Sequence, residues 1–454
     1  MSQRPPAGRA LGAPFRHAAF RYLAAGRVVT MLGNAVAPIA LAFAVLDLTG
    51  SARDLGLVVG ARSLTNVIFI LFGGVVADRL PRQFVMVASG ALAALSQAVV
   101  ATLVLTDTAT VPLLMALGAV NGVVSAFAFP AAAALIAQTV PQDIRKQANA
   151  VNRLGINAAT ILGASLGGLL IAAVGPGWGL VVDATTFGLA GVLFAFVRVP
   201  SYRDEAPARP ESTLYQLREG WVEFVSHTWV WVVVLGFCFW NMALVGALSV
   251  LGPIVADDSF GRQTWGLILA AQTVGMVAGA ILAMRLRVRH LLLLGVTCCA
   301  GPLLLLLSLA LTPALVVLIP AAFVAGMAVE QFGIAWEVSI QEHIAPDKLA
   351  RVYSYDALGS FIAIPIGQVA AGPIAEAAGT HVALLIAGGV LALSVVGMLL
   401  SRGVRTLEHR QTKVAMDPTP RLQKLRWPRP RHPNPTSTTL IATLTPVHCC
   451  PDRH

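Results

Sequence analysis

Charged residues are scarce in this sequence. Only 12% of its 454 residues are Asp, Glu, Lys or Arg, whereas a soluble globular domain carries about 25%. Hydrophobic residues make up 56% of the chain, and the mean hydropathy is +0.75. A water-soluble fold cannot cover so much apolar surface, but helices that face lipid need no polar exterior. The composition therefore excludes a soluble globular protein and indicates an integral membrane protein.

Cysteine is scarce as well, with five residues in the chain. Three of them lie in apolar runs, and the other two, Cys449 and Cys450, follow His448 in a polar tail. This placement argues against a disulfide framework. The tail cluster has nothing around it to fix a coordination geometry. We therefore expect no metal and no cofactor.

Long apolar runs recur along the whole chain. A helix needs about 20 residues to cross roughly 30 Å of hydrocarbon. The first run follows Arg16 and Arg21 and is too long for a signal-peptide core, so we predict a first membrane helix there. The runs predict an all-α polytopic membrane protein with twelve spans, at residues 21–46, 54–77, 83–105, 111–138, 149–173, 178–198, 230–255, 264–285, 290–311, 314–337, 352–376 and 381–401.

Lys and Arg are distributed unequally between the two sets of loops. One set carries only Arg53 and Arg262, beside acids such as Asp107. The positive-inside rule assigns the other set to the cytoplasm, so both termini are predicted to be cytoplasmic in a plasma-membrane protein. Because the net charge of +10 lies in short loops, we expect contact with anionic lipid and not with nucleic acid. The basic loops contain Arg79, Arg82, Arg145, Lys146, Arg198, Arg203, Arg209, Arg218, Arg285, Arg287, Arg289, Lys348 and Arg351.

The second half of the chain weakly repeats the first. The segment from Pro141 to Gly175 has a counterpart about 204 residues later, ending at Gly379, and Leu55-Gly56-Leu57 is echoed by Trp265-Gly266-Leu267. A period of half the chain predicts two related six-helix bundles. We expect bundles at 1–198 and 230–402, a linker with an amphipathic surface helix at 199–229, and a disordered basic tail at 403–454.

The short loop after the second predicted span carries a distinctive charge pattern. Gly74 is followed by Asp78, Arg79 and Arg82, with Pro81 and Gln83 where a glycine and a second basic residue are usual. This loop resembles the signature of the major facilitator superfamily, and the resemblance covers roughly residues 15–402. Further pieces resemble the branch that contains macrolide-efflux proteins and the enterobactin exporter, namely Phe20-Arg21-Tyr22-Leu23, Asp47-Leu48-Thr49-Gly50-Ser51, Gln147-Ala148-Asn149-Ala150 and Pro365-Ile366-Gly367.

The resemblance implies a transporter that alternates between inward-open and outward-open states, with Gly74, Asp78, Arg79 and Arg82 as a gating motif. Most relatives in this branch are presumed to be proton-driven exporters. We therefore expect a monomeric exporter of a small amphipathic or drug-like molecule, driven by protons. Uptake of a nutrient by symport is the alternative. A polytopic enzyme or a sensor is disfavoured, because no nucleotide loop, metal constellation or signalling domain is recognisable in the sequence.

Charged residues within the spans are candidates for substrate binding or proton coupling, because a charge at membrane depth needs a partner or an aqueous cavity. Arg27 and Arg62 could serve either in salt bridges or in function. Glu330 and Glu337, seven residues apart, share one helix face and are the preferred proton carriers. Asp183 closely follows Gly175 to Gly179, so we predict that it stabilises the amino end of its helix.

Aromatic residues and one amide mark the walls of a predicted central cavity. By the resemblance, the first, fourth, seventh and tenth spans line this cavity. Packing against lipid would explain the aromatic residues equally well. The cavity-lining candidates are Asn34, Phe127, Trp240, Phe332 and Trp336.

Overall fold

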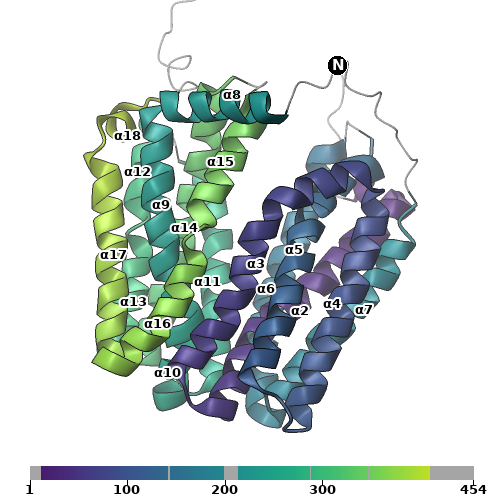
Figure 1. Ribbon diagram of the computed structural model, residues 1–454. Helices are drawn as coiled ribbons and strands as arrows, with labels where there is room; N and C mark the ends of the chain where they lie inside the picture. Colours follow the sequence, from purple (N-terminus) through teal and green to yellow (C-terminus); the bar gives the residue numbers. More distant parts are fainter. Residues whose placement is uncertain (1–11, 142–143, 199–212, 287, 346–347, 410–454) are drawn as a thin grey trace, which may run out of the picture. The chain divides into compact units, whose positions relative to one another are not determined.

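The computed structural model describes residues 12–141, 144–198, 213–286, 288–345 and 348–409, and each regular element in these ranges is helical (Figure 1). Eleven of the described helical segments are long and apolar enough to cross a membrane. Both findings confirm the predicted class, an all-α polytopic membrane protein.

The first half of the chain contains a short 3-10 turn, η1, and six long helices. Their ends fall within four residues of the predicted spans, because the apolar runs are bounded by charged residues, prolines or glycines. The elements are η1 Ala13–Arg16, α2 Ala18–Thr49, α3 Ala52–Arg79, α4 Arg82–Leu105, α5 Val111–Thr139, α6 Arg145–Val174 and α7 Pro176–Ala195.

The second half contains the other six predicted spans, three of them divided into shorter pieces. It begins with the linker helix α8. Its elements are α8 Thr213–Ser226, α9 Thr228–Gly246, η3 Ala247–Leu251, α10 Gly252–Val255, η4 Ala256–Phe260, α11 Arg262–Ala283, α12 Leu291–Cys298, α13 Gly301–Leu311, α14 Leu315–His343, α15 Leu349–Phe361, α16 Ile364–Ala378, α17 Thr380–Leu400 and α18 Arg402–Thr406.

Prolines accompany the three interruptions. Pro302 and Pro365 stand at the start of α13 and α16. Proline has no backbone N–H, so a carbonyl group in the preceding turn of helix loses its hydrogen-bond donor. Pro253 lies in α10, between the π-helical segments η3 and η4. Apolar length alone predicts that each of these spans is continuous, because it does not reveal a break.

Helix α3 corresponds to the second predicted span, and the side chains of its residues 71–79 lie outside the described residues. Arg53, Asp54 and Arg62 all fall in its first eleven residues. The helix nevertheless packs extensively against α5 and α16. These contacts hold it within the bundle.

The long helices form two bundles. In the amino-terminal bundle, α2 packs on α6 and α7, α3 on α5, and α4 on α7. In the carboxy-terminal bundle, α14 packs on α11, α12 and α13, while α9 packs on α16 and α17. Matching positions in the two halves have matching geometry: Gly175 and Gly379, 204 residues apart, both end a helix at positive φ (89° and 90°). Only glycine adopts this conformation without strain.

The two ends of the helices differ in charge. We call the end at which α3 passes into α4 the basic end; it contains Arg82, Arg145, Arg285 and Lys348. The opposite end, at which α2 passes into α3, is called the acidic end. It contains Asp47, Asp54, Asp107, Asp257, Asp258 and Glu376 together with Arg53 and Arg262.

Helix α8 belongs to the predicted linker and runs across the ends of α9 and α15 at the basic end (Figure 1). Lys348 Nζ donates to Glu223 Oε2 of α8 at 2.7 Å. The rings of Trp221 and Phe224 both contact Tyr355. The linker residues 199–212 lie outside the described residues.

The predicted disordered tail begins too early. Helix α18 occupies 402–406, and the chain after it is held by side chains of the bundle. Arg289 donates to Glu408 at 2.9 Å, and His409 lies 2.9 Å from Glu342. Ordered structure therefore continues to His409, because charged residues after the last span find partners at the basic end. The remainder of the predicted tail lies outside the described residues.

Candidate functional site

Two pairs of helices make the most extensive contacts between the bundles, α6 with α11 and α3 with α16. Glycines allow the backbones to touch. A Cβ atom added at Gly266 of α11 would collide with the Ala164 carbonyl of α6, and one at Gly372 of α16 would lie 2.5 Å from the Ala52 carbonyl. Small residues at such positions permit close helix approach in membranes. We call these two contacts the seams between the bundles.

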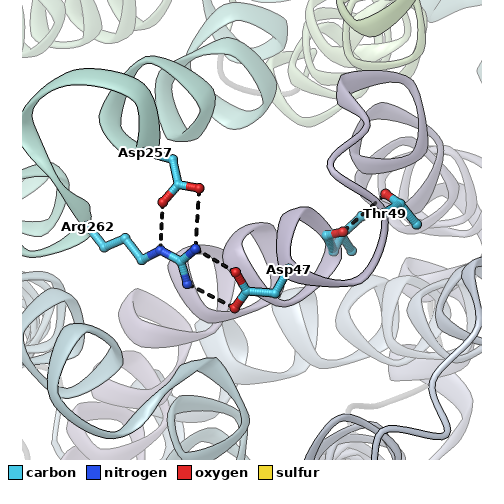
Figure 2. A network of polar contacts seen from close by, with 5 residues as sticks. Asp47, Thr49, Asp257 and Arg262 are labelled. Atoms are coloured by element: carbon cyan, nitrogen blue, oxygen red, sulfur yellow. Dashed lines mark hydrogen bonds and ion pairs between the residues drawn. The ribbon is translucent and has the colours of Figure 1, made fainter.

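An ionic cluster reinforces the α6–α11 contact at the acidic end, and we call it the arginine bridge (Figure 2). Arg262, the first residue of α11, donates from its Nη1 and Nη2 atoms to Asp47 of α2 at 2.9 and 2.5 Å. Its Nε donates to Asp257 at 2.8 Å. The guanidinium also lies 4.7 Å from the centre of the Phe43 ring. One cation of the carboxy-terminal bundle thus holds a carboxylate of each bundle.

A different polar group reinforces the α3–α16 contact. The Glu376 Oε1 atom of α16 accepts a hydrogen bond from the Ser51 hydroxyl at 2.9 Å and one from the Arg53 backbone N–H at 3.3 Å. Both donors are at the amino end of α3, where a carboxylate is favoured by the free N–H groups and the helix dipole.

A second ion pair crosses between the bundles at greater depth. Arg153 Nη2 of α6 donates to Glu330 Oε1 of α14 at 2.7 Å. The Glu330 side chain is only 10% exposed, whereas that of Arg153 is 65% exposed. The next residue, Gln331, donates to the Gly279 carbonyl of α11 at 2.5 Å. The structure therefore gives the predicted proton carrier Glu330 a cationic partner on the opposite bundle.

The inter-bundle contacts described above are concentrated at the acidic end, with the Arg153–Glu330 pair as the deeper exception. In the sequence, Arg262 is distinguished only as one of two basic residues in the acidic loops, and Arg153 is not among the predicted site residues. A signal for the bridge was present in the internal repeat. Asp47 and Asp257 are 210 residues apart, the same offset that relates Gly56 to Gly266.

A polar cluster is buried inside the amino-terminal bundle. Gln97 of α4 donates to the Asp183 carboxylate of α7, and Arg62 of α3 interacts with Asp183 electrostatically. Asn121 of α5 is 3% exposed, and its side chain has no hydrogen-bond partner among the described residues. Arg62, Gln97 and Asn121 line one small cavity. Arg62 therefore lies within the electrostatic influence of a carboxylate of its own bundle.

The prediction that Asp183 stabilises the amino end of its helix is wrong. Helix α7 begins at Pro176, which places Asp183 about two turns inside it. Its side chain is directed to Gln97 and not to the free N–H groups of the first turn. The helix begins earlier than expected because Pro176 is well tolerated in a first turn.

A second cavity, of about 200 Å³, lies within the amino-terminal bundle between α2, α4, α5 and α7. It extends from the middle of these helices towards the basic end. Arg27 and Asn34 of α2 both line it, so the structure brings together two of the predicted candidates. The other lining residues are Thr30, Met31, Met86, Ser89, Gly90, Ala93, Val124, Ser125, Ala128, Ala132, Phe187 and Phe194.

The predicted aromatic wall is part of the protein core in this structure. Phe237 stacks on both Trp240 and Phe332, with ring centroids 4.7 and 4.6 Å away. Trp240 also donates to the Cys299 carbonyl at 2.9 Å, and Trp336 donates to Asp356 at 3.0 Å. All three predicted residues of the carboxy-terminal bundle are less than 10% exposed. In the amino-terminal bundle, Phe127 of α5 packs against Phe69 of α3.

Two further predictions concern the basic end. The side chains of Gly74, Asp78 and Arg79 lie outside the described residues, so the gating role remains a prediction. Arg82 is half-buried at the start of α4. Beside it, Gln83 donates to the Ala195 carbonyl at 2.9 Å. Glu337 is exposed and accepts a hydrogen bond from Gln341 at 3.2 Å, unlike the buried Glu330.

Two helical bundles, joined by glycine-mediated contacts and carrying paired charges at membrane depth, define a polytopic membrane transporter. The sequence model of the Major Facilitator Superfamily matches residues 23–290 and 246–447. The chain belongs to this superfamily, which confirms the resemblance carried by its motifs and makes it a transporter and not an enzyme.

Curated relatives and solved structures agree with this assignment. The chain is 27% identical to the multidrug efflux pump Tap of Mycolicibacterium fortuitum, over 82% of this chain and 92% of that one. It is 20% identical to the macrolide efflux protein A of Streptococcus pyogenes, over 85% and 96%. Its fold is similar to that of the nucleoside transporter NupG, with a TM-score of 0.65 and 14% identity over 85% and 100% of the chains. An inward-facing bacterial homologue of the human lysosomal transporter Spinster gives 0.67 and 16%, over 86% and 97%.

Proposed function

We propose that this protein is a proton-driven exporter of small amphipathic, drug-like molecules that works by alternating access in the plasma membrane. Its relatives over more than four-fifths of the chain include a multidrug efflux pump and a macrolide efflux protein. This similarity is the observation that carries the assignment to efflux. We also propose that the protein works as a monomer, because its two bundles together supply both gates.

The proposed orientation places the basic end and both termini in the cytoplasm. Lys and Arg prevail among the charges of the basic end, while acids prevail at the other end. Anionic lipid headgroups on the cytoplasmic side favour this arrangement. In this orientation the arginine bridge and the Glu376 contact close the extracellular side, and the structure corresponds to an inward-facing state.

Export then requires two rearrangements. Arg262 must leave Asp47, and Glu376 must leave Ser51, before substrate can depart at the acidic end. At the basic end, Gly74, Asp78, Arg79 and Arg82 form the proposed gate that closes as the other opens. Each gate is closed in only one of the two states. Its contacts therefore stabilise that state and shift the equilibrium towards it.

Proton coupling is assigned to Glu330. When ionised, it holds Arg153 of the opposite bundle at 2.7 Å. Protonation of the carboxylate removes its charge and weakens the pair. The pair crosses the interface, so binding of a proton to Glu330 alters the cohesion of the two bundles. Arg62 and Asp183 are retained as second candidates, because they form a buried charged cluster within one bundle.

Transport by purified protein in vesicles tests the proposal. With an imposed pH gradient, a fluorescent amphipathic substrate should move against the incoming protons, and collapse of the gradient should stop accumulation. Glu330→Gln should leave the exchange of substrate between the two sides intact while abolishing its response to the gradient. Glu337→Gln, on the same face but exposed, is the matched control and should remain coupled. Proton and substrate movement in the same direction would identify an importer instead.

A further inference from the structure

Among the residues that the structure describes, Arg27 at membrane depth in the amino-terminal bundle has no counter-charge. Arg27 lines the 200 Å³ cavity and has no hydrogen bond or ion pair with any residue that the structure describes. It is also the one lining residue with a formal charge. By contrast, Arg62 interacts with Asp183, Arg153 pairs with Glu330, and Arg262 pairs with two aspartates.

An unpaired guanidinium is costly at this depth. Arg27 is nine residues into α2, about 14 Å from its basic end. A charged group away from bulk water needs either a partner or an aqueous cavity. The surrounding wall is largely apolar, with methionine, phenylalanine, alanine and valine side chains. A bound anion would provide the missing partner.

The residues of the cavity wall indicate which kind of molecule carries that anion. A guanidinium binds a carboxylate through two parallel hydrogen bonds. Asn34 and Ser89 also line the cavity without a side-chain partner among the described residues, so the wall offers further hydrogen-bond donors to a polar ligand. Met31 and Met86 present flexible apolar surface that adapts to varied ring systems.

We propose, on the basis of the exporter function above, that this cavity binds amphipathic weak acids, with the carboxylate at Arg27 and the apolar part against Met31, Met86 and Phe187. The cavity is smaller than the roughly 300–1,000 Å³ of a pocket that encloses a whole drug-sized ligand. It therefore holds the acidic end of the molecule. An amphipathic cation of the same shape is repelled by Arg27 and meets no acid among the lining residues.

Binding of three matched probes to the full-length protein in nanodiscs tests this inference: naphthylacetate, naphthylacetamide and naphthylethylamine. We expect the acid to bind about tenfold more tightly than the amine, with the amide between them, a difference of about 1.4 kcal/mol. Arg27→Gln should reduce the preference for the acid to less than about twofold. Arg27→Lys, which keeps the charge but loses the two-pronged geometry, should retain part of it.

Arg21→Gln, on the same helix but exposed, is the matched control and should keep the full preference. Thermal unfolding of each variant shows whether it is folded. Equal or tighter binding of the amine by the native protein would overturn the inference, as would an undiminished acid preference in a folded Arg27→Gln variant. If vesicles export amphipathic cations but bind no acid, the exporter proposal stands and this inference fails. If acid binding depends on Arg27 but no export occurs, the binding site is supported and the exporter proposal fails.

Discussion

The two contacts between the bundles share one geometry but differ in their chemistry. In both, a glycine on one helix meets the backbone of its partner: Gly168 lies against α11, and Gly372, 204 residues later, lies against α3. Gly56 and Gly266 complete the two contacts from the other side. The backbone packing therefore follows the repeat of the chain.

The polar groups do not follow that repeat. At the α6–α11 contact, Arg262 is the charged donor, and it takes the place that Ala52 has in the first half. At the α3–α16 contact, Glu376 is the charged acceptor, and its counterpart 204 residues earlier is Ala172. Asp47 and Asp257 are equivalent by the repeat, but both now bind the same arginine.

This difference indicates that the glycine contacts and the polar contacts close the acidic end in different ways. The glycine contacts are short-range and non-directional, and any added atom disrupts them. The polar contacts can be weakened in small steps because water replaces each lost partner. Asymmetric polar groups on a symmetric backbone allow the two seams to open with different free energies.

The largest effect is expected when a methyl group is added at either seam. Gly266→Ala and Gly372→Ala place a Cβ against backbone atoms, which cannot move aside as a side chain can. Overpacking of this kind costs about 1–3 kcal/mol, or about 5- to 150-fold in the equilibrium between states. Spin labels at the exposed positions Thr108 and Thr312, in a cysteine-free background, should show the acidic ends moving apart.

Gly389→Ala is the control for this experiment, because a Cβ at that position meets no atom within 4 Å. It adds the same helix propensity without touching a seam, so the distance between the labels should not change. The seams are equivalent if the two variants shift the distance equally. A native distance in both variants would show that the glycines are not the closing contact.

Next in size is the effect of breaking the arginine bridge. Asp47 belongs to the amino-terminal bundle and Asp257 to the carboxy-terminal bundle, so only the Arg262–Asp47 pair crosses the seam. Asp47→Asn should open the acidic end nearly as much as Arg262→Gln, by about 1–2 kcal/mol or roughly 5- to 30-fold. Asp257→Asn should have a much smaller effect. The label distance and a double-mutant cycle between positions 47 and 262 measure the coupling.

The side chains of the bridge are partly exposed, at 23% for Arg262 and 44% for Asp47, so solvent screening keeps the expected effect below that of the glycine variants. High salt should reduce it further. Equal effects of the two aspartate variants would contradict the division of roles between them.

The sequence was sufficient for the fold because span length and composition have a direct physical cause in membrane thickness. The boundaries of α4, α5 and α11 were predicted to within two residues. The interruptions near Pro302 and Pro365 were missed, since proline can also remain inside a membrane helix, as Pro38 does in α2. Whether a proline breaks a helix depends on the neighbours that satisfy the freed carbonyl groups.

The candidate site was predicted less completely. Glu330, Arg27 and Asn34 could be selected because a polar group in an apolar run is conspicuous. The partners could not be selected, because Arg153 and Glu330 are 177 residues apart and their meeting depends on how the bundles pack. Arg262 was passed over because it lies in a loop-like stretch where charge is ordinary. Only the tertiary contact shows that it crosses a seam.

A smaller effect should follow from neutralising the acceptor of the second seam. In Glu376→Gln an amide oxygen can still accept from the Ser51 hydroxyl and the Arg53 N–H. The expected shift is therefore under about 1 kcal/mol, whereas Glu376→Ala, which removes the acceptor, should shift the label distance further. If the Gln and Ala variants behave alike, charge and not hydrogen bonding holds the α3–α16 seam, and the two seams are more alike than proposed.

The smallest effect on the seams is expected from an ion pair that crosses neither of them. Glu223 and Lys348 attach α8 to the carboxy-terminal bundle, and the hydrogen bond from Lys348 lowers the pKa of Glu223 below its usual value of 4.5. A lowered pKa means that the contact stabilises the docked helix above that usual value and is lost as the pH falls through the lowered pKa. A spin label at the exposed Val222 should accordingly gain mobility only in acid. Glu223→Ala, which removes the acceptor, should be mobile at every pH, and the distance between the labels at Thr108 and Thr312 should stay native in both proteins at neutral pH. A change in that distance at neutral pH would show that docking of α8 affects the seams. It would contradict the distinction between ion pairs that cross a seam and those that do not.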